Sequence, residues 1–122
     1  MNDTTGVAMT ARVVPDSGLQ AGDRLIVTGT LGDHGLAVMA RRHGLMLDGD
    51  LHSDVAPINR LVRAALDAAP GAIVAMKDPT RGGVASALHE MAAKSRVGIT
   101  LDEMALPVTP QARAAGELLG ID

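Results

Sequence analysis

Apolar and polar positions follow two rhythms along the chain. Short runs rich in β-branched residues, bounded by turn residues, predict three strands. These lie at Arg24–Gly29, Ala72–Met76 and Val97–Leu101, and residues 1–20 hold a further apolar segment compatible with one more strand and a linker. Apolar residues at helical spacing predict four helices. They cover Leu36–Arg42, a stretch with Pro57 in its first turn that ends before Pro70, Val84–Ser95, and Pro110–Leu119.

Several residues are predicted to begin or end these helices. Thr109, followed by Pro110, and Thr80 have the side chains that cap a helix start, and Asp54 or Ser53 is placed to cap the second helix. Gly44 follows the first helix and Gly120 the last, where glycine is typical.

The alternation of strands and helices predicts an α/β fold, of the two-layer α+β kind. We expect a small mixed sheet with helices packed mainly on one face. With no Phe, Tyr or Trp among 122 residues, the core must consist of Ala, Val, Leu, Ile and Met. Such an incomplete sheet is expected to leave an apolar surface or a strand edge uncovered.

Composition excludes several classes of function. The net charge is -3, without a basic run, and aromatic residues for base stacking are absent, so a nucleic-acid partner is not expected. The lack of cysteine excludes disulfides and thiolate chemistry in this chain. No apolar run approaches the length of a membrane span, so we expect no membrane partner and a cytoplasmic location.

The first candidate site is the segment Asp78-Pro79-Thr80-Arg81-Gly82-Gly83, here called the DPTRGG turn. Two glycines in the first turn of a helix make sense if a ligand approaches the backbone closely. Free N–H groups at a helix start, a hydroxyl and an arginine suit phosphate or carboxylate. The site residues predicted for this phosphate or substrate cleft are Asp78, Thr80, Arg81, Gly82 and Gly83. The alternative is a joint whose glycines only let the helix pack.

Asp33-His34, at a second glycine-rich turn, is the other candidate. A histidine there can act as acid or base near neutral pH, whereas in the alternative Asp33 caps a helix and His34 lies at the surface. His89-Glu90 is interpreted as structural or solvated. His52 with Asp54, and Asp102 with Glu103, are weak metal ligand sets, and no metal site is predicted.

Several segments together resemble, in order, the HypE family of nickel–iron hydrogenase maturation proteins. They are Gly29–Gly35, Ser53-Asp54, Asp78–Val84, Gly98-Ile99, Leu106–Val108 and Gly116–Gly120. This family belongs to the superfamily of aminoimidazole ribonucleotide synthetase, selenophosphate synthetase and thiamine-monophosphate kinase. The resemblance implies that residues 1–20 are the end of an N-terminal ATP-binding domain with its linker. Residues 21–122 would then be the first part of a C-terminal α/β domain.

The same resemblance implies an activity. HypE-like proteins use ATP and Mg²⁺ to dehydrate a carbamoyl group, placed by HypF on their own C-terminal cysteine, to a thiocyanate. The cyano group then passes to iron held by a HypC–HypD complex, and the full-length protein is a homodimer. The chain alone is expected to be inactive and to bind ATP and Mg²⁺ weakly. The alternatives are a fragment of a sister enzyme, such as selenophosphate synthetase, or a non-catalytic module that binds maturation partners.

Overall fold

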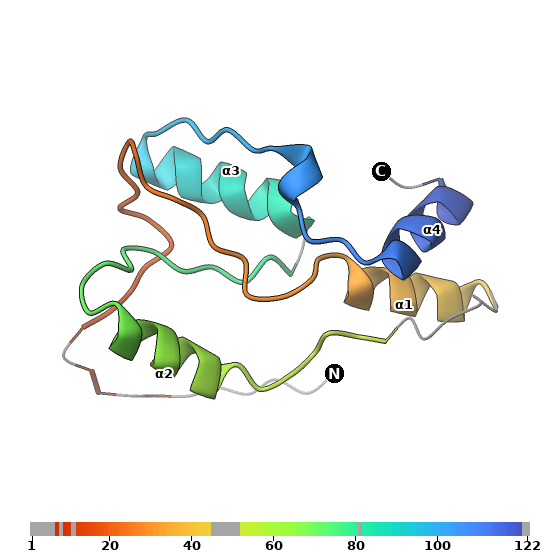
Figure 1. Ribbon diagram of the computed structural model, residues 1–122, viewed down its shortest axis with the longest axis horizontal. Coiled ribbons are helices and arrows are strands. Elements are labelled where there is room, and N and C mark those ends of the chain that lie inside the picture. Colours follow the sequence, from red (N-terminus) through yellow and green to blue (C-terminus); the bar gives the residue numbers. More distant parts are fainter. Residues whose placement is uncertain (1–6, 8, 11, 45–51, 81, 121–122) are drawn as a thin grey trace.

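The structure is a computed structural model that describes residues 7, 9–10, 12–44, 52–80 and 82–120. The described part holds four α-helices and one 3-10 helix (Figure 1). They are α1 (Asp33–Arg42), α2 (Asn59–Ala68), α3 (Gly83–Ser95), η1 (Glu103–Ala105) and α4 (Pro110–Leu119). All four predicted helices are therefore confirmed as elements.

The last helix begins and ends where its sequence predicts. The Thr109 hydroxyl accepts a hydrogen bond from the Ala112 N–H at 3.0 Å, and Pro110 occupies the first turn. Gly120 ends α4 in the left-handed conformation, with a φ of 66°. A capping hydroxyl, a proline with preset φ and a glycine free of Cβ strain fix both ends locally.

Two predicted helix starts are wrong. Helix α2 begins at Asn59 after Ile58, beyond Pro57 and without a side-chain cap. Neither predicted cap, Ser53 or Asp54, can reach a start at Asn59, because a capping side chain accepts an N–H only two or three positions after it. The Ser53 hydroxyl instead accepts the Val55 N–H. Helix α3 is preceded by Gly82 rather than by the predicted cap Thr80.

The predicted mixed sheet is not confirmed, because the described residues contain no strand. Extended segments do meet, but through single backbone hydrogen bonds. The Met76 N–H donates to the Pro15 carbonyl, and the Leu31 N–H donates to the Pro107 carbonyl, both at 2.9 Å. Each acceptor is a proline, which has no N–H to complete a reciprocal pair. The segments predicted as strands, 24–29, 72–76 and 97–101, form no ladder.

The buried apolar residues are few and small. Helices α1 and α4 pack on each other (Figure 1), and each buries alanine: Ala40 in α1, Ala112 and Ala115 in α4. Helix α3 buries Ala87 and Met91. Helix α2 buries no residue, although its pattern is strongly amphipathic.

Much apolar surface is exposed, although the sheet predicted to carry it is not present in the described residues. Ile26, in the extended segment at 24–29, is 86% exposed, and Ile58 before α2 is 57% exposed. The accessible surface is 10007 Å², whereas about 6,200 Å² is expected for a compact monomer of this mass. The chain by itself thus covers only part of its apolar surface.

Candidate functional site

The DPTRGG turn joins an extended segment to the start of α3. Gly82 precedes the helix with a φ of 72°, and Gly83 begins it with a φ of 61°. No side chain caps this start, so its first N–H groups remain available to an acceptor. Asp78 and Thr80 are exposed beside it, while Arg81 lies outside the described residues.

Gly82 is required by its surroundings as well as by its backbone. A Cβ atom at this position would lie 2.7 Å from the Ser86 Cβ, and closer still to the Ser86 hydroxyl. Left-handed φ values are unfavourable for other residues. At Gly83, by contrast, a Cβ would meet nothing within 4 Å. Gly82 is therefore required both by its backbone conformation and by the lack of space for a Cβ, whereas Gly83 is favoured by its backbone conformation alone.

The exposed face of α3 carries an open depression of about 450 Å³. Ala85, Ser86, His89 and Glu90 line it. Ser86 also neighbours Gly82, so the depression begins close to the DPTRGG turn. The sequence pattern does not include Ser86 in this site, and it predicts a structural or solvated position for His89-Glu90. The signal that could have found them is their spacing, since positions 82, 86, 89 and 90 share one helix face.

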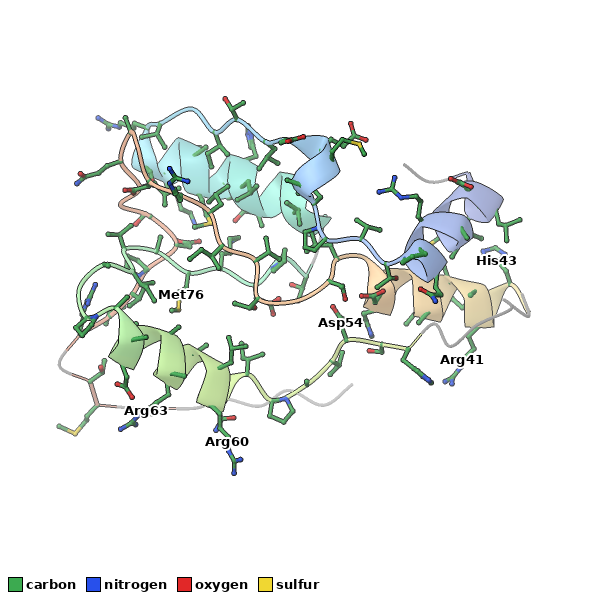
Figure 2. All side chains as sticks on the ribbon, in the orientation of Figure 1. Arg41, His43, Asp54, Arg60, Arg63 and Met76 are labelled. Atoms are coloured by element: carbon green, nitrogen blue, oxygen red, sulfur yellow. The ribbon has the colours of Figure 1, made fainter. Side chains whose placement is uncertain are left out.

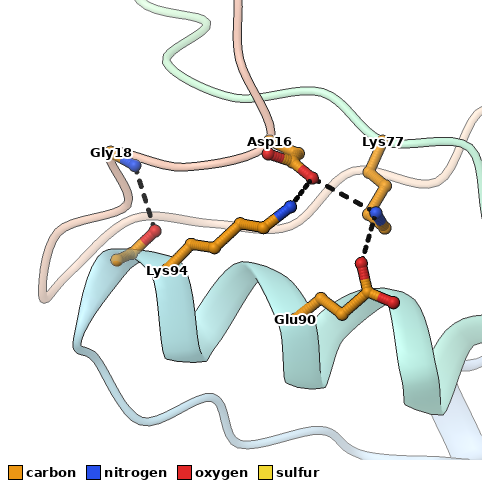
Figure 3. Close-up of polar contacts among 6 residues, drawn as sticks. Asp16, Gly18, Lys77, Glu90 and Lys94 are labelled. Atoms are coloured by element: carbon orange, nitrogen blue, oxygen red, sulfur yellow. Dashed lines mark hydrogen bonds and ion pairs between the residues drawn. The ribbon is translucent and has the colours of Figure 1, made fainter.

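Lys77, directly before the turn, is the centre of an ion-pair network with Asp16, Glu90 and Lys94 (Figure 3). The Lys77 Nζ lies 2.8 Å from a Glu90 oxygen and 3.2 Å from an Asp16 oxygen, and Lys94 contacts that same Asp16 oxygen. The Lys77 side chain is 21% exposed. The network joins three segments that are distant in sequence, and no local pattern predicts it.

Hydrogen bonds within the network shift three pKa values. Those from Lys94 and Lys77 lower the pKa of Asp16 from its usual 3.8, and that from Lys77 lowers the pKa of Glu90 from 4.5. Those to Glu90 and Asp16 raise the pKa of Lys77 above 10.5. The two carboxylates thus contribute their full stabilisation at pH values above their usual pKa values. That stabilisation is lost as the pH falls through their lowered pKa values in the folded protein. Lys77 stabilises it fully below 10.5, and this is lost as pH rises through its raised pKa.

These shifts predict a pH dependence for Lys77→Met. Its loss of stability relative to the parent is expected to be constant between about pH 5 and pH 10, and to shrink below about pH 4. Because the partners are partly exposed, added salt should also reduce the loss. Urea unfolding followed by far-ultraviolet circular dichroism measures both effects. A loss that grows in acid would contradict this assignment of the network.

Arg63→Met is the matched control. Arg63 projects outward from α2 (Figure 2) and pairs with Asp67 at 3.8 Å, with both side chains more than 70% exposed. An exposed pair of this kind contributes little, so this variant should follow the parent at every pH.

Asp33 and His34, at the start of α1, form their hydrogen bonds with residues outside the DPTRGG turn. Asp33 is 5% exposed at the start of α1, and its carboxylate accepts hydrogen bonds from the hydroxyls of Thr30 and Thr109. His34 is exposed, with Nδ1 2.9 Å from the Ser53 hydroxyl. Among the described residues, neither side chain shares a hydrogen bond with residues 78–83. Their catalytic role stays a prediction, and the geometry gives Asp33 a structural one.

The weak metal ligand sets do not assemble further in the described part of the chain. No three His, Cys, Asp or Glu side chains gather there as a metal site would require. Asp102 instead caps η1, accepting the Met104 N–H at 3.0 Å. In the same residues, no helix is long and apolar enough to span a membrane.

Residues 20–121 match the family described as AIR synthase related protein, C-terminal domain. The chain belongs to this family. The match covers the DPTRGG turn, the depression on α3 and Asp33 with its partners, but it begins after Asp16. Most residues of the candidate site therefore lie within the matched domain, whereas Asp16 of the ion-pair network precedes it.

Two curated relatives are carbamoyl dehydratases HypE. The chain is 50% identical over 104 residues to that of Escherichia coli (strain K12), covering 85% of this chain and 30% of the relative. It is 43% identical over 121 residues to that of Cupriavidus necator, covering 98% and 34%. The chain thus spans about a third of the length of these relatives, and it is similar to proteins of hydrogenase maturation.

Solved structures show the same likeness. The crystal structure of E. coli HypE, a hydrogenase maturation protein, matches with a TM-score of 0.84 and 46% identity, covering 93% of this chain and 34% of that one. The crystal structure of a HypE–HypF complex matches with a TM-score of 0.71 and 46% identity, covering 77% and 30%. The predicted fold family, that of the C-terminal domain of aminoimidazole ribonucleotide synthetase-like proteins, is confirmed.

Proposed function

We propose that this chain forms part of a HypE-like carbamoyl dehydratase, in which the DPTRGG turn binds a phosphate group of ATP or the carbamoylated tail. The observation that carries the proposal is its identity of 43–50% to proteins named carbamoyl dehydratase HypE, across residues that include the turn. In such a protein the carbamoyl oxygen on a C-terminal cysteine would take the γ-phosphoryl group of ATP, releasing ADP. That oxygen would then leave as inorganic phosphate while the nitrogen loses its two protons, which leaves a thiocyanate.

The residues of the turn suit an anion. An uncapped helix start offers N–H donors and the positive end of the helix dipole. Gly83 leaves space beside its Cα, so a ligand can approach the backbone there. Thr80 can donate a hydrogen bond, and Arg81 can neutralise charge as phosphate is transferred. Mg²⁺ would accompany ATP, and we assign its ligands to none of the described residues.

HypF is the partner best supported, because a HypE–HypF complex is among the similar structures. The HypC–HypD complex, homodimerisation and a cytoplasmic location stay predictions. So does the expectation that this chain alone is inactive. The sister enzymes and the non-catalytic module remain the alternatives, and no structural feature favours either.

A chimaera tests the proposal. Residues 20–121 replace the aligned third of E. coli HypE, and ATP hydrolysis that depends on the carbamoylated cysteine is measured. The chimaera is expected to be active. Arg81→Ala is expected to raise the KM for ATP about 10- to 100-fold, the effect of losing one charge-assisted hydrogen bond.

Arg63→Ala, on the exposed face of α2, serves as the control and should leave kinetic constants unchanged. A folded chimaera without activity would overturn the proposed function. If the chimaera is active and Arg81→Ala leaves its KM for ATP unchanged, the proposed function stands but the DPTRGG turn is not part of the ATP site. In calorimetry, the isolated chain should show no tight binding of ATP with Mg²⁺.

A further inference from the structure

The segment before the matched domain, residues 12–19, is fastened to the elements that carry the DPTRGG turn. The Arg12 guanidinium donates to the Ile73 carbonyl at 2.7 Å, and Met76 donates to Pro15. At the other end, the Ser95 hydroxyl accepts the N–H groups of Gly18 and Leu19 at 3.0 and 3.1 Å. These contacts hold residues 12–19, here called the leading segment, against both the extended segment at 72–77 and α3.

Lys77 adds a side-chain contact to both the leading segment and α3. Its ammonium group contacts Asp16 in the leading segment and Glu90 on α3, while its backbone continues directly into Asp78 (Figure 3). Glu90 also lines the depression that begins beside Gly82. A shift of Lys77 would thus move the turn relative to the leading segment and to the helix face.

Lys77 is poorly suited to bind the phosphate itself. Two carboxylates already surround its ammonium group at 2.8 and 3.2 Å. They use two of its three N–H donors and neutralise its charge. Arg81 precedes the helix start itself and is the better candidate for that contact.

We propose that Lys77 is a positioning residue, which fixes the DPTRGG turn against the leading segment and so sets the orientation in which preceding residues meet the turn. The expected effect on catalysis rests on the proposed function. The attachment of Lys77 to Asp16 and Glu90 does not depend on it. Orientation affects the rate of a bound substrate more than its binding, because reacting groups must meet within a narrow geometry.

The test compares Lys77→Met, Lys77→Arg and Arg63→Met in a chimaera that includes residues 12–121. Lys77→Met is expected to lower kcat about 10-fold or more, with the KM for ATP within about twofold of the parent. Lys77→Arg retains the charge and both partners, and it should restore most of kcat. Arg63→Met should behave as the parent.

Three kinetic outcomes overturn the proposal. If Lys77→Met leaves kcat unchanged, the network does not position the turn. If it raises the KM for ATP as Arg81→Ala does, Lys77 is a ligand. A low kcat that Lys77→Arg does not restore would also contradict it, since the charge would then not be the cause.

Hydrogen exchange in the 122-residue chain tests the attachment without activity. Lys77→Met should accelerate amide exchange about fivefold or more both in peptides covering Gly18 and Leu19 and in peptides covering Gly82 and Gly83. Acceleration confined to one of the two regions would overturn the proposal. If the unmutated chimaera is inactive, the proposed function fails, and this exchange pattern alone decides whether Lys77 couples the segments.

Discussion

Replacing Asp33 by alanine is expected to lower the free energy of unfolding by about 3 kcal/mol, since hydrogen bonds to a buried charged group are among the stronger ones. The Asp33 carboxylate is 5% exposed and accepts hydrogen bonds from two hydroxyls, those of Thr30 and Thr109. Thr109 begins α4, and Asp33 begins α1. The variant therefore removes a link between the starts of the two helices that pack together, and leaves two hydroxyls without their acceptor.

Urea unfolding, followed by far-ultraviolet circular dichroism because the chain lacks aromatic residues, measures this loss. Asp33→Asn keeps one acceptor oxygen and should lose about half as much as Asp33→Ala. Asp67→Ala, which removes a carboxylate that is 73% exposed, should stay within about 0.5 kcal/mol of the parent. An Asp33→Ala variant as stable as Asp67→Ala would show that the buried hydrogen bonds do not hold α1 to α4.

The same residue shows how far local sequence can predict a site. The sequence places Asp33 at a glycine-rich helix start, and this is correct. Whether such a carboxylate faces solvent or a second helix depends on Thr109, which is 76 residues away. A catalytic carboxylate and a structural one look the same in the sequence at this position. Only the contact with Thr109 distinguishes the two roles.

Helix ends follow the sequence where the deciding contacts are local, and differ where they are not. Thr109 caps α4 through a local contact, because its hydroxyl accepts the N–H of Ala112 only three positions later. Ser53 does not cap α2, because the helix begins only at Asn59, out of reach of the Ser53 hydroxyl. The strand pattern at 72–76 likewise does not decide the outcome alone. The residue that faces Met76 is Pro15, which has no N–H with which to return a second hydrogen bond.

The ion-pair network marks the limit of sequence reasoning. Asp16 and Lys77 are 61 residues apart, and each alone resembles a solvated surface charge. The DPTRGG turn was predictable as a special position because two glycines stand where helix propensity disfavours them. Its neighbours on α3 could have been found from their helical spacing, whereas the contacts of Lys77 depend on where the leading segment lies.

Gly82→Ala is expected to be the other strongly destabilising change, by about 3 kcal/mol. A left-handed backbone costs an L-residue about 1–2 kcal/mol, and a Cβ placed 2.7 Å from the Ser86 Cβ adds overpacking of similar size. Gly83→Ala meets no neighbour within 4 Å. It should lose only about 1 kcal/mol, from the backbone strain less the entropy gained in the unfolded chain. Unfolding by urea compares the two adjacent variants directly.

A double-mutant cycle with Ser86→Gly identifies the cause. If the clash contributes, Gly82→Ala should destabilise the Ser86→Gly protein less than the parent, with a coupling of about 1–2 kcal/mol. Equal losses in both backgrounds would leave backbone strain as the whole effect.

The Gly83→Ala variant then separates folding from binding. Its side chain would occupy space that is empty in this chain, so its loss of stability should be small and its structure intact. If a phosphate approaches the backbone at this point, the same methyl group should raise the KM for ATP of the chimaera well beyond what the stability loss explains. A chimaera that tolerates Gly83→Ala would mean that the glycines serve the joint between the extended segment and α3, and that the anion, if bound, lies elsewhere along the turn.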